Sequence, residues 1–306
     1  MKTVAIVLTL NEENHIRRCI ESIQQVTNNI LVVDSFSIDQ TCEIAVSLGA
    51  KVLKHSFLNY ANQFNWAIDQ VADDADWIMR IDADEVISKE LAVEFNRELP
   101  QLPEKVAGVY FPRSFFFLNK RIRHGGASRV KALRLWRAKR GRCENRWMDE
   151  HIIVDGATVS FSGDLLDYNL NPLSWWTAKH NSYSNREAVD LLNLKYGFMP
   201  VDSVASLTSG SSAGLKRWVK ERVYSRLPIG LRAFGYFIYR YFFALGFLDG
   251  RAGLVFHFLQ GFWYRFLVDA KVYEVERHMA LNRCGAVQAI REVLGIDLAP
   301  EGSGRA

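Results

Sequence analysis

The chain has 306 residues, of which 49% are hydrophobic, 12% aromatic and 24% charged. This composition excludes a disordered or collagen-like chain, and the length allows one large domain or two modest ones. Its 38 Lys and Arg residues exceed its 34 Asp and Glu residues by four. The positive charge is concentrated in residues 105–146, where 13 basic residues accompany a single acidic one, Glu144. Such a run attracts phosphate groups.

The four cysteines form no CxxC pair, which excludes a disulfide framework and a zinc-finger pattern. Free cysteines of this kind suit a reducing compartment. The apolar run at the N-terminus is short and is followed by Glu12 and Glu13. Because a secretory signal needs a longer apolar stretch, we interpret this run as a buried first strand.

Apolar runs alternate with helix-like spacing through the first 81 residues. Strands are expected over 4–10, 30–33, 51–53 and 77–81, and helices over 14–26, 41–48 and 61–71. This alternation predicts an α/β fold with a mostly parallel sheet flanked by helices. Ligands of such sheets bind at the carboxyl ends of the strands.

Polar motifs follow three of the expected strands. They are Thr9-Leu10-Asn11-Glu12, the stretch Asp34-Ser35-Phe36-Ser37-Ile38-Asp39-Gln40-Thr41, and Asp82-Ala83-Asp84-Glu85. Neither the dinucleotide fingerprint GxGxxG nor a GxxxxGK[ST] phosphate loop is present. Because the three motifs lie at strand ends, we expect them to face one crevice, which is neither of these two phosphate-binding types.

The three carboxylates within Asp82–Glu85 repel one another unless a cation lies among them. Hard oxygen ligands suit Mg²⁺ or Mn²⁺, and the sequence does not choose between the two ions. A carboxylate at Asp34 can accept a hydrogen bond from a base, and Asp39 and Thr41 either bind a ribose or only cap the next helix.

In this order and spacing, the three motifs resemble a family 2 glycosyltransferase with the GT-A fold, over about residues 1–170. The resemblance implies that Thr9, Asn11 and Glu12 line a nucleotide-sugar pocket, with Asp34 at the uracil and Asp39 nearby. Further donor-site residues and metal ligands are implied at three places: Arg80 and Asp82 at the ribose or diphosphate, Asp84 with Asp82 at the metal, and Asn65 near the donor.

Family members carry an acidic catalytic base on a later segment, which matches Trp147-Met148-Asp149-Glu150-His151 here. We favour Glu150 over Asp149, and the sequence leaves the choice open. The resemblance implies an inverting transfer, in which the base takes the proton of an acceptor hydroxyl. A divalent ion would neutralise the leaving diphosphate.

Within the family, the chain resembles small bacterial enzymes that add a β-linked glucose to the lipopolysaccharide inner core. That resemblance implies UDP-glucose as the donor, a glycolipid or core oligosaccharide as the acceptor, and a peripheral location on the cytoplasmic face of the bacterial inner membrane. It leaves the oligomeric state open.

The sequence changes character after about residue 170. We expect a helical region over 171–306, with a linker at 203–214 and a basic, apolar stretch at 215–231. Two aromatic runs, 233–248 and 253–268, are shorter than the roughly 20 residues that span a bilayer. Their Arg and aromatic residues favour helices in the membrane interface, so peripheral membrane contact is predicted through 215–268. A buried hairpin or a dimer interface is the alternative.

Two other functions are compatible with parts of the sequence. One is a non-catalytic protein that binds a nucleotide or glycan on the same scaffold and docks to membranes. The other is a metal-dependent phosphoryl-transfer or nucleic-acid enzyme that uses the basic run 105–146. The missing phosphate loop and the motif at Asp34 count against the latter, and no nucleic-acid partner is expected.

Overall fold

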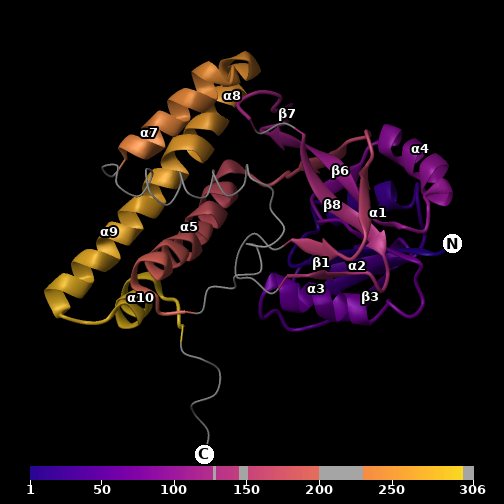
Figure 1. Cartoon of the computed structure of the whole chain (residues 1–306), viewed down its shortest axis with the longest axis horizontal. Helices are drawn as coiled ribbons and strands as arrows, with labels where there is room; N and C mark the ends of the chain where they lie inside the picture. The colour runs from indigo at the N-terminus through magenta and orange to yellow at the C-terminus, as the bar shows by residue number, and fades with distance from the viewer. Residues whose placement is uncertain (127–128, 145–150, 200–229, 299–306) are drawn as a thin grey trace, which may run out of the picture. The chain divides into compact units, whose positions relative to one another are not determined.

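The computed structural model describes residues 1–126, 129–144, 151–199 and 230–298. The chain divides into two compact units (Figure 1). The first contains Met1–Pro172 and also Leu248–Ala252, and the second contains Leu173–Phe247 and Gly253–Ala306.

The first unit opens with the predicted alternation of strands and helices. The elements are β1 (Thr3–Thr9), α1 (Ile16–Ile23), β2 (Ile30–Asp34), α2 (Thr41–Ser47), β3 (Lys51–Lys54), α3 (Tyr60–Asp69) and β4 (Trp77–Arg80). The later elements are β5 (Glu85–Ile87), α4 (Lys89–Glu98), the short helix η1 (Leu99–Gln101), β6 (Val106–Phe117), β7 (Lys120–Arg121), β8 (Val130–Arg137), β9 (Gly141–Cys143), β10 (Ile152–Val154), β11 (Ala157–Ser160) and β12 (Leu165–Tyr168). All seven elements predicted up to residue 81 are confirmed, although α1 is shorter than expected.

The central sheet is mixed, with the strand order β3-β2-β1-β4-β8-β6-β12-β5. The first four of these strands are parallel, as predicted. Strand β8 runs antiparallel to both of its neighbours, β4 and β6, so the sheet as a whole is less parallel than expected. The chain turns back directly after β6, since β7 already pairs antiparallel with it, and β8 then also pairs antiparallel with β6.

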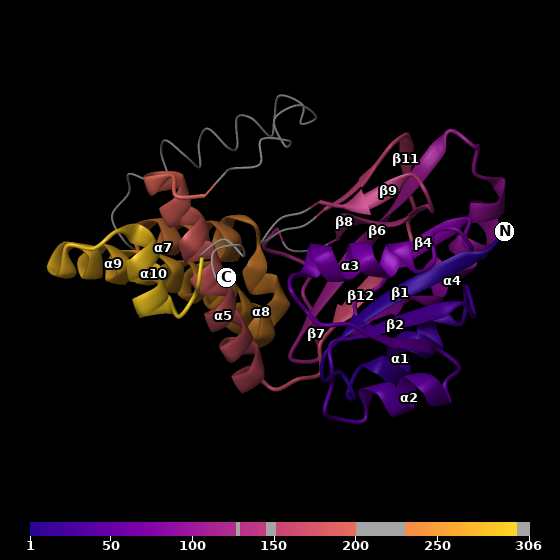
Figure 2. The same cartoon turned by 90° about the horizontal axis from the view of Figure 1, so that it is seen from below.

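Strand β1 is buried on both faces of the sheet. Ala5 and Val7 pack in the core with α1, whereas Val4 and Ile6 pack in the core with α3. Figure 2 shows α1 and α2 on one face and α3 on the other. A strand covered on both faces needs an almost continuous apolar sequence, and 3–9 has one. This three-layer arrangement confirms the predicted α/β class of the GT-A type.

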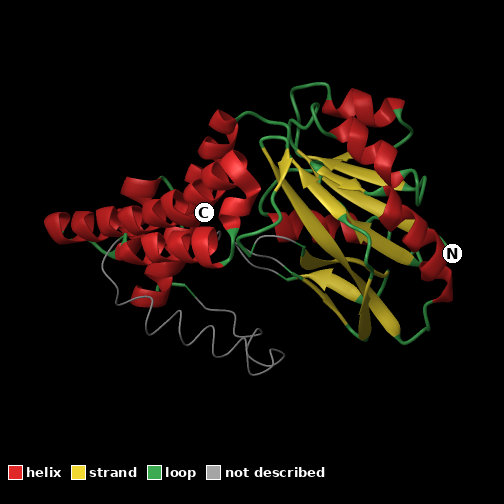
Figure 3. Ribbon diagram, turned by 90° about the horizontal axis from the view of Figure 1, so that it is seen from above, coloured by secondary structure: helices red, strands yellow, loops and turns green. Residues whose placement is uncertain are grey.

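The second unit is helical, as Figure 3 shows. Its elements are α5 (Leu173–Tyr196), α7 (Leu231–Ile238), the π-helical turn η4 (Tyr239–Phe243), α9 (Tyr264–Asn282) and α10 (Ala286–Leu294). Between η4 and α9 the chain forms η5 (Gly246–Asp249), α8 (Gly250–Phe256) and a second π-helical segment, η6 (His257–Trp263). The predicted helical C-terminal region is confirmed.

The segment Leu248–Ala252 returns to the first unit and is held there by Asp249. This carboxylate is 3% exposed and accepts hydrogen bonds from the backbone N–H groups of Arg123 and His124, at 3.1 and 2.9 Å. The Nδ1 atom of His124 lies 2.9 Å from the same carboxylate. A residue 125 positions along the chain therefore fixes the loop that follows β7.

No single helix among the described residues is long and apolar enough to cross a membrane. Taken together, the helices Leu231–Phe243 and Gly246–Asn282 are long and apolar enough to cross, by length and composition only. They are bent by 72° at the break between them.

Candidate active site

The loops that follow β1 and β2 are joined by hydrogen bonds. Asn11 donates its backbone N–H to Ser37 Oγ at 2.8 Å and accepts one from the N–H of Ile38 at 3.0 Å. Asn11 and Phe36 both have positive φ angles, of 56° and 64°. This conformation is rare for an aromatic residue and is found where a loop is shaped for a function. The side chain of Phe36 is 54% exposed at this edge of the sheet.

Asp34 is fully buried at the carboxyl end of β2. Its carboxylate accepts hydrogen bonds from the hydroxyl of Thr9 at 2.9 Å and from the backbone N–H of Ser37 at 2.8 Å. Thr9 and Asp34 are therefore brought together, as predicted from their strand ends. Their polar atoms hold the two loops in register.

Asp39 and Glu12 fasten the same loops to the helices that follow. Asp39 accepts hydrogen bonds from the backbone N–H groups of Thr41 at 3.0 Å and of Glu13 at 3.1 Å. Burial raises its pKa, but these bonds and that of the Thr41 hydroxyl outweigh it, so the pKa lies below its usual value. The Glu12 carboxylate pairs with His15 at 2.6 Å. Asp39 thus binds the backbone of Thr41, the first residue of α2, and Gln40 stands at the N-cap position.

Asp82 lies at the end of β4 between cationic side chains. Its Oδ2 atom accepts a hydrogen bond from Arg134 at 2.9 Å, and its Oδ1 atom accepts one from the Tyr60 hydroxyl at 3.0 Å and lies 3.4 Å from Arg80 Nε. The Arg80 guanidinium stacks over the Tyr60 ring at 4.2 Å. Burial alone would raise the pKa of Asp82, but the guanidiniums of Arg134, Arg80 and Arg113 hold it well below its usual range.

Glu85 is the most buried member of the acidic motif, with no exposed surface. It pairs with Arg134 at 2.5 Å and with Arg113 at 3.0 Å, and Arg113 also pairs with Asp167 at 2.5 Å. Burial raises the pKa of Glu85 to about 7 against the opposing charges of Arg134 and Arg113, and it raises that of Asp167 to about 6 against Arg113. The buried Arg134 and the half-buried Arg113 thus link three carboxylates in a continuous network.

Asp84 has a different environment from Asp82 and Glu85. Its carboxylate is half-buried and accepts a hydrogen bond from the Asn169 side chain at 3.0 Å. In the part of the chain that the structure describes, it forms no ion pair with Lys or Arg. Its backbone carbonyl accepts the N–H of Tyr168 at 3.0 Å, which fixes the residue against β12.

This donor set fits a divalent cation of the Mg²⁺ type. Such ions bind through one or two carboxylates and complete their shell with water and phosphate oxygens. The Asp84 carboxylate forms no ion pair in the described ranges, although the Arg18 guanidinium lies close by and donates to the Asp84 backbone carbonyl at 3.5 Å. Asp82 has both oxygens engaged by Arg134, Arg80 and Tyr60, so Asp84 is the more available donor of the two predicted ligands.

The predicted residue Asn65 lies elsewhere in the unit. Its side-chain amide donates to the carbonyl of Cys143 at 2.9 Å and accepts the N–H of Cys143 at 3.0 Å. Both polar ends of Asn65 are therefore used to attach α3 to β9. The predicted base residues Asp149 and Glu150 lie outside the described residues. His151 is exposed, with Nδ1 3.8 Å from Glu144.

Several side chains of the site were missed in the sequence. They are Tyr60, Arg113, Asp167 and Asn169, and Arg134 stood out only as one of the basic residues of the run 105–146. All lie beyond the first four strands or at a helix start, and none stands in a motif. The available signal was the alternation of Arg with apolar residues in 130–137, which places Arg134 on a buried strand.

Residues 4–141 match the family model described as glycosyl transferase family 2. An uncharacterised glycosyltransferase of Rickettsia conorii is 42% identical over 95 residues, which are 31% of this chain and 33% of that protein. The match thus spans about a third of the length of this curated relative. The lipopolysaccharide core biosynthesis glycosyltransferase LpsC of Rhizobium meliloti is 27% identical over 191 residues, which are 60% of this chain and 69% of LpsC.

Among solved structures, glucosyl-3-phosphoglycerate synthase from Mycobacterium tuberculosis is 18% identical, with a TM-score of 0.37 over 58% of this chain and 75% of that chain. The family match covers β1 to β8 and includes the loops after β1 and β2 and the acidic motif after β4. Residues Val4–Gly141 of this chain are thus similar to a glycosyl transferase family 2 domain.

Proposed function

We propose that this protein is an inverting glycosyltransferase that moves a sugar, with UDP-glucose as the expected donor, onto a lipid-linked glycan. The observation that carries this proposal is the environment of Asp84, whose carboxylate forms no ion pair among the described residues, beside Asp82 and Glu85, which arginines neutralise. A dication bound at Asp84 would complete its shell with oxygens of the diphosphate that accompanies it.

The paired loops after β1 and β2 would hold the nucleotide. Thr9, Asn11, Glu12, Asp34 and Asp39 are the predicted contacts, and their hydrogen bonds preform the loop surface before any ligand arrives. Because Asp34 is buried, a uracil would approach it past Phe36, whose exposed ring offers an apolar face for stacking.

Arg80 and Asp82 would lie on the ribose or diphosphate side of the donor. A dication on Asp84 would neutralise charge on the leaving diphosphate. The chain's own part is to orient the acceptor hydroxyl and to take its proton. Glu150 remains the proposed base, with Asp149 as the alternative. One displacement on the sugar would invert its anomeric centre.

A lipid-linked acceptor accords with the helical unit and with the resemblance to LpsC. Large apolar side chains are exposed along the stretch from α7 to α9: Leu231, Phe234, Tyr239, Phe242, Phe243, Leu245, Phe247, Leu254, Phe258 and Phe266. Aromatic side chains of this kind favour the membrane interface. We propose peripheral contact through this stretch, at the cytoplasmic face of a bacterial inner membrane.

The test is metal-dependent release of UDP from a panel of UDP-sugars, with and without a bacterial glycolipid extract. We expect release that requires one sugar, Mg²⁺ or Mn²⁺, and the extract. Asp84→Asn should lower the rate by about 10²–10³-fold, the range found when a group that stabilises transition-state charge is removed.

Asp74→Asn is the matched control, because Asp74 is an exposed aspartate in the turn after α3. Its rate should stay at the wild-type level. UDP binding without any release would favour the non-catalytic alternative. Full activity in Asp84→Asn would show that the metal assignment is wrong.

A further inference from the structure

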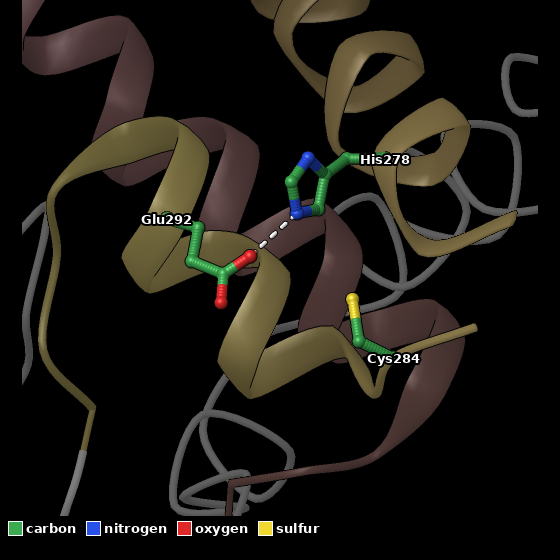
Figure 4. A group of neighbouring side chains, drawn as sticks. All are labelled: His278, Cys284 and Glu292. Carbon is green, nitrogen blue, oxygen red and sulfur yellow. Dashed lines mark hydrogen bonds and ion pairs between the residues drawn. The ribbon is translucent and has the colours of Figure 1, made fainter. Parts of the chain in front are cut away.

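The hairpin of α9 and α10 brings a histidine, a cysteine and a glutamate together. His278 lies near the end of α9, Cys284 in the turn, and Glu292 on α10. One ligand atom of each, an imidazole nitrogen, the sulfur and a carboxylate oxygen, lie within 4.8 Å of one another. Figure 4 shows the three side chains around one space.

Hydrogen bonds already orient Glu292 toward this space. His278 Nε2 lies 2.6 Å from its Oε2 atom, and the side chain of Gln288 donates to its Oε1 atom at 2.9 Å. A carboxylate held by an outer hydrogen bond is the usual arrangement of a metal ligand.

Cys284 lies in the turn between the two helices. It is two residues before the first residue of α10, a helix of nine residues. The preceding Arg283 has a φ of 51°, a left-handed conformation that ends α9 and turns the chain toward α10. The turn thus presents sulfur to the pair formed by His278 and Glu292.

We propose that His278, Cys284 and Glu292 form a zinc site, with a fourth position left for water. Imidazole, thiolate and carboxylate are the ligands that Zn²⁺ takes in tetrahedral sites. Mg²⁺ prefers oxygen ligands alone and does not suit a sulfur. The thiolate and the carboxylate together would balance the charge of the ion.

The ion would hold α9 and α10 together. These helices share with α5 a small apolar core whose buried members are Val189, Leu192, Val275, Ala289 and Ile290. Because a small core provides little stability, metal binding to the folded hairpin would add to it directly. This role is separate from sugar transfer, since all three ligands lie in the helical unit.

The experiment uses the full chain, stripped with a chelator and titrated with Zn²⁺ or with Co²⁺ in buffer that contains Mg²⁺. We expect one ion per chain, a rise in the melting temperature, and a thiolate-to-cobalt charge-transfer band. Cys284→Ser should abolish the band. Cys42→Ser, at the half-buried cysteine of α2, should keep it.

Two further variants keep the test decisive if Cys284→Ser does not fold. Glu292→Gln changes an exposed side chain, and Gln288→Ala removes only the outer hydrogen bond; the latter should weaken Zn²⁺ binding about 10- to 100-fold. Absence of the band in the wild type, or a band that follows Cys42 instead, would overturn the proposal. The cluster would then be a His–Glu ion pair beside a thiol, and the result would not bear on UDP release.

Discussion

The two units of this chain differ in their exposed aromatic side chains, although each also buries ion pairs. The α/β unit buries charge: Arg134, Asp82 and Glu85 form ion pairs in its interior, and Arg134 is 3% exposed. The helical unit exposes apolar surface, with Phe243 76% exposed. Buried ions must be paired, and exposed aromatic groups are stable in water only at a cost. The difference suggests two surroundings, a preorganised polar crevice and a lipid surface.

The largest expected effect follows from removing Arg134, the central cation of the buried network. Arg134→Met leaves Asp82 and Glu85 buried with fewer partners, and we expect a loss of about 3–5 kcal/mol in the free energy of unfolding. Urea denaturation measures it. Lys139→Met, at an exposed position beside β8, should change the value by less than about 0.5 kcal/mol. A similar small change in Arg134→Met would mean that the network does not stabilise the unit.

The second test concerns the pH dependence of the same network. Because burial raises the pKa of Glu85 to about 7 from its ordinary value of 4.5, the folded state binds more protons than the unfolded state between these values. The contribution of Glu85 to stability is therefore present below pH 4.5 and is lost as pH rises to 7.

The difference in unfolding free energy between wild type and Glu85→Gln should change across this window by an amount on the order of 2–3 kcal/mol. Denaturation at pH 5 and pH 7.5 measures it. Equal differences at both values would mean that the arginines keep Glu85 ionised throughout.

The smallest expected effect concerns the exposed aromatic side chains of the helical unit. Phe243→Ser should lower partition onto anionic vesicles about tenfold, because a buried aromatic ring contributes roughly 1.5–3 kcal/mol. Its stability in water should be unchanged, since the ring is exposed. Val93→Ser, at a 64% exposed residue of α4, is the control for the first unit. Equal binding by all three proteins would place the aromatic stretch in a protein interface instead.

Much of the fold was predictable from local sequence. Strands β1 to β4 have continuous apolar sequences, and polar residues follow them. These strands and the grouping of Asp34 with Thr9 could therefore be inferred. The strand direction of β8 could not, because hairpin and crossover connections leave similar apolar runs. Local patterns also gave no sign that 248–252 belongs to the first unit.

The site was predicted where its members stand in a compact motif and was missed where they do not. Asp82 and Asp84 stand in a compact motif, whereas Arg134 lies 52 residues further along the chain. Such pairing depends on which strand lies beside β4, and sequence spacing does not encode that. Tyr60 was missed for a similar reason, since its hydroxyl reaches Asp82 from the start of α3.

The return of Leu248–Ala252 to the first unit has a consequence for how this chain can be divided or recombined. The polypeptide passes between the units three times, after Pro172, Phe247 and Ala252. A gene cut after Pro172 would yield a first unit without Asp249, and with two backbone N–H groups of the loop after β7 deprived of their acceptor. Leu248–Ala252 is thus embedded in the sequence of the helical unit. A single crossover that exchanges the helical unit between relatives would also exchange these five residues.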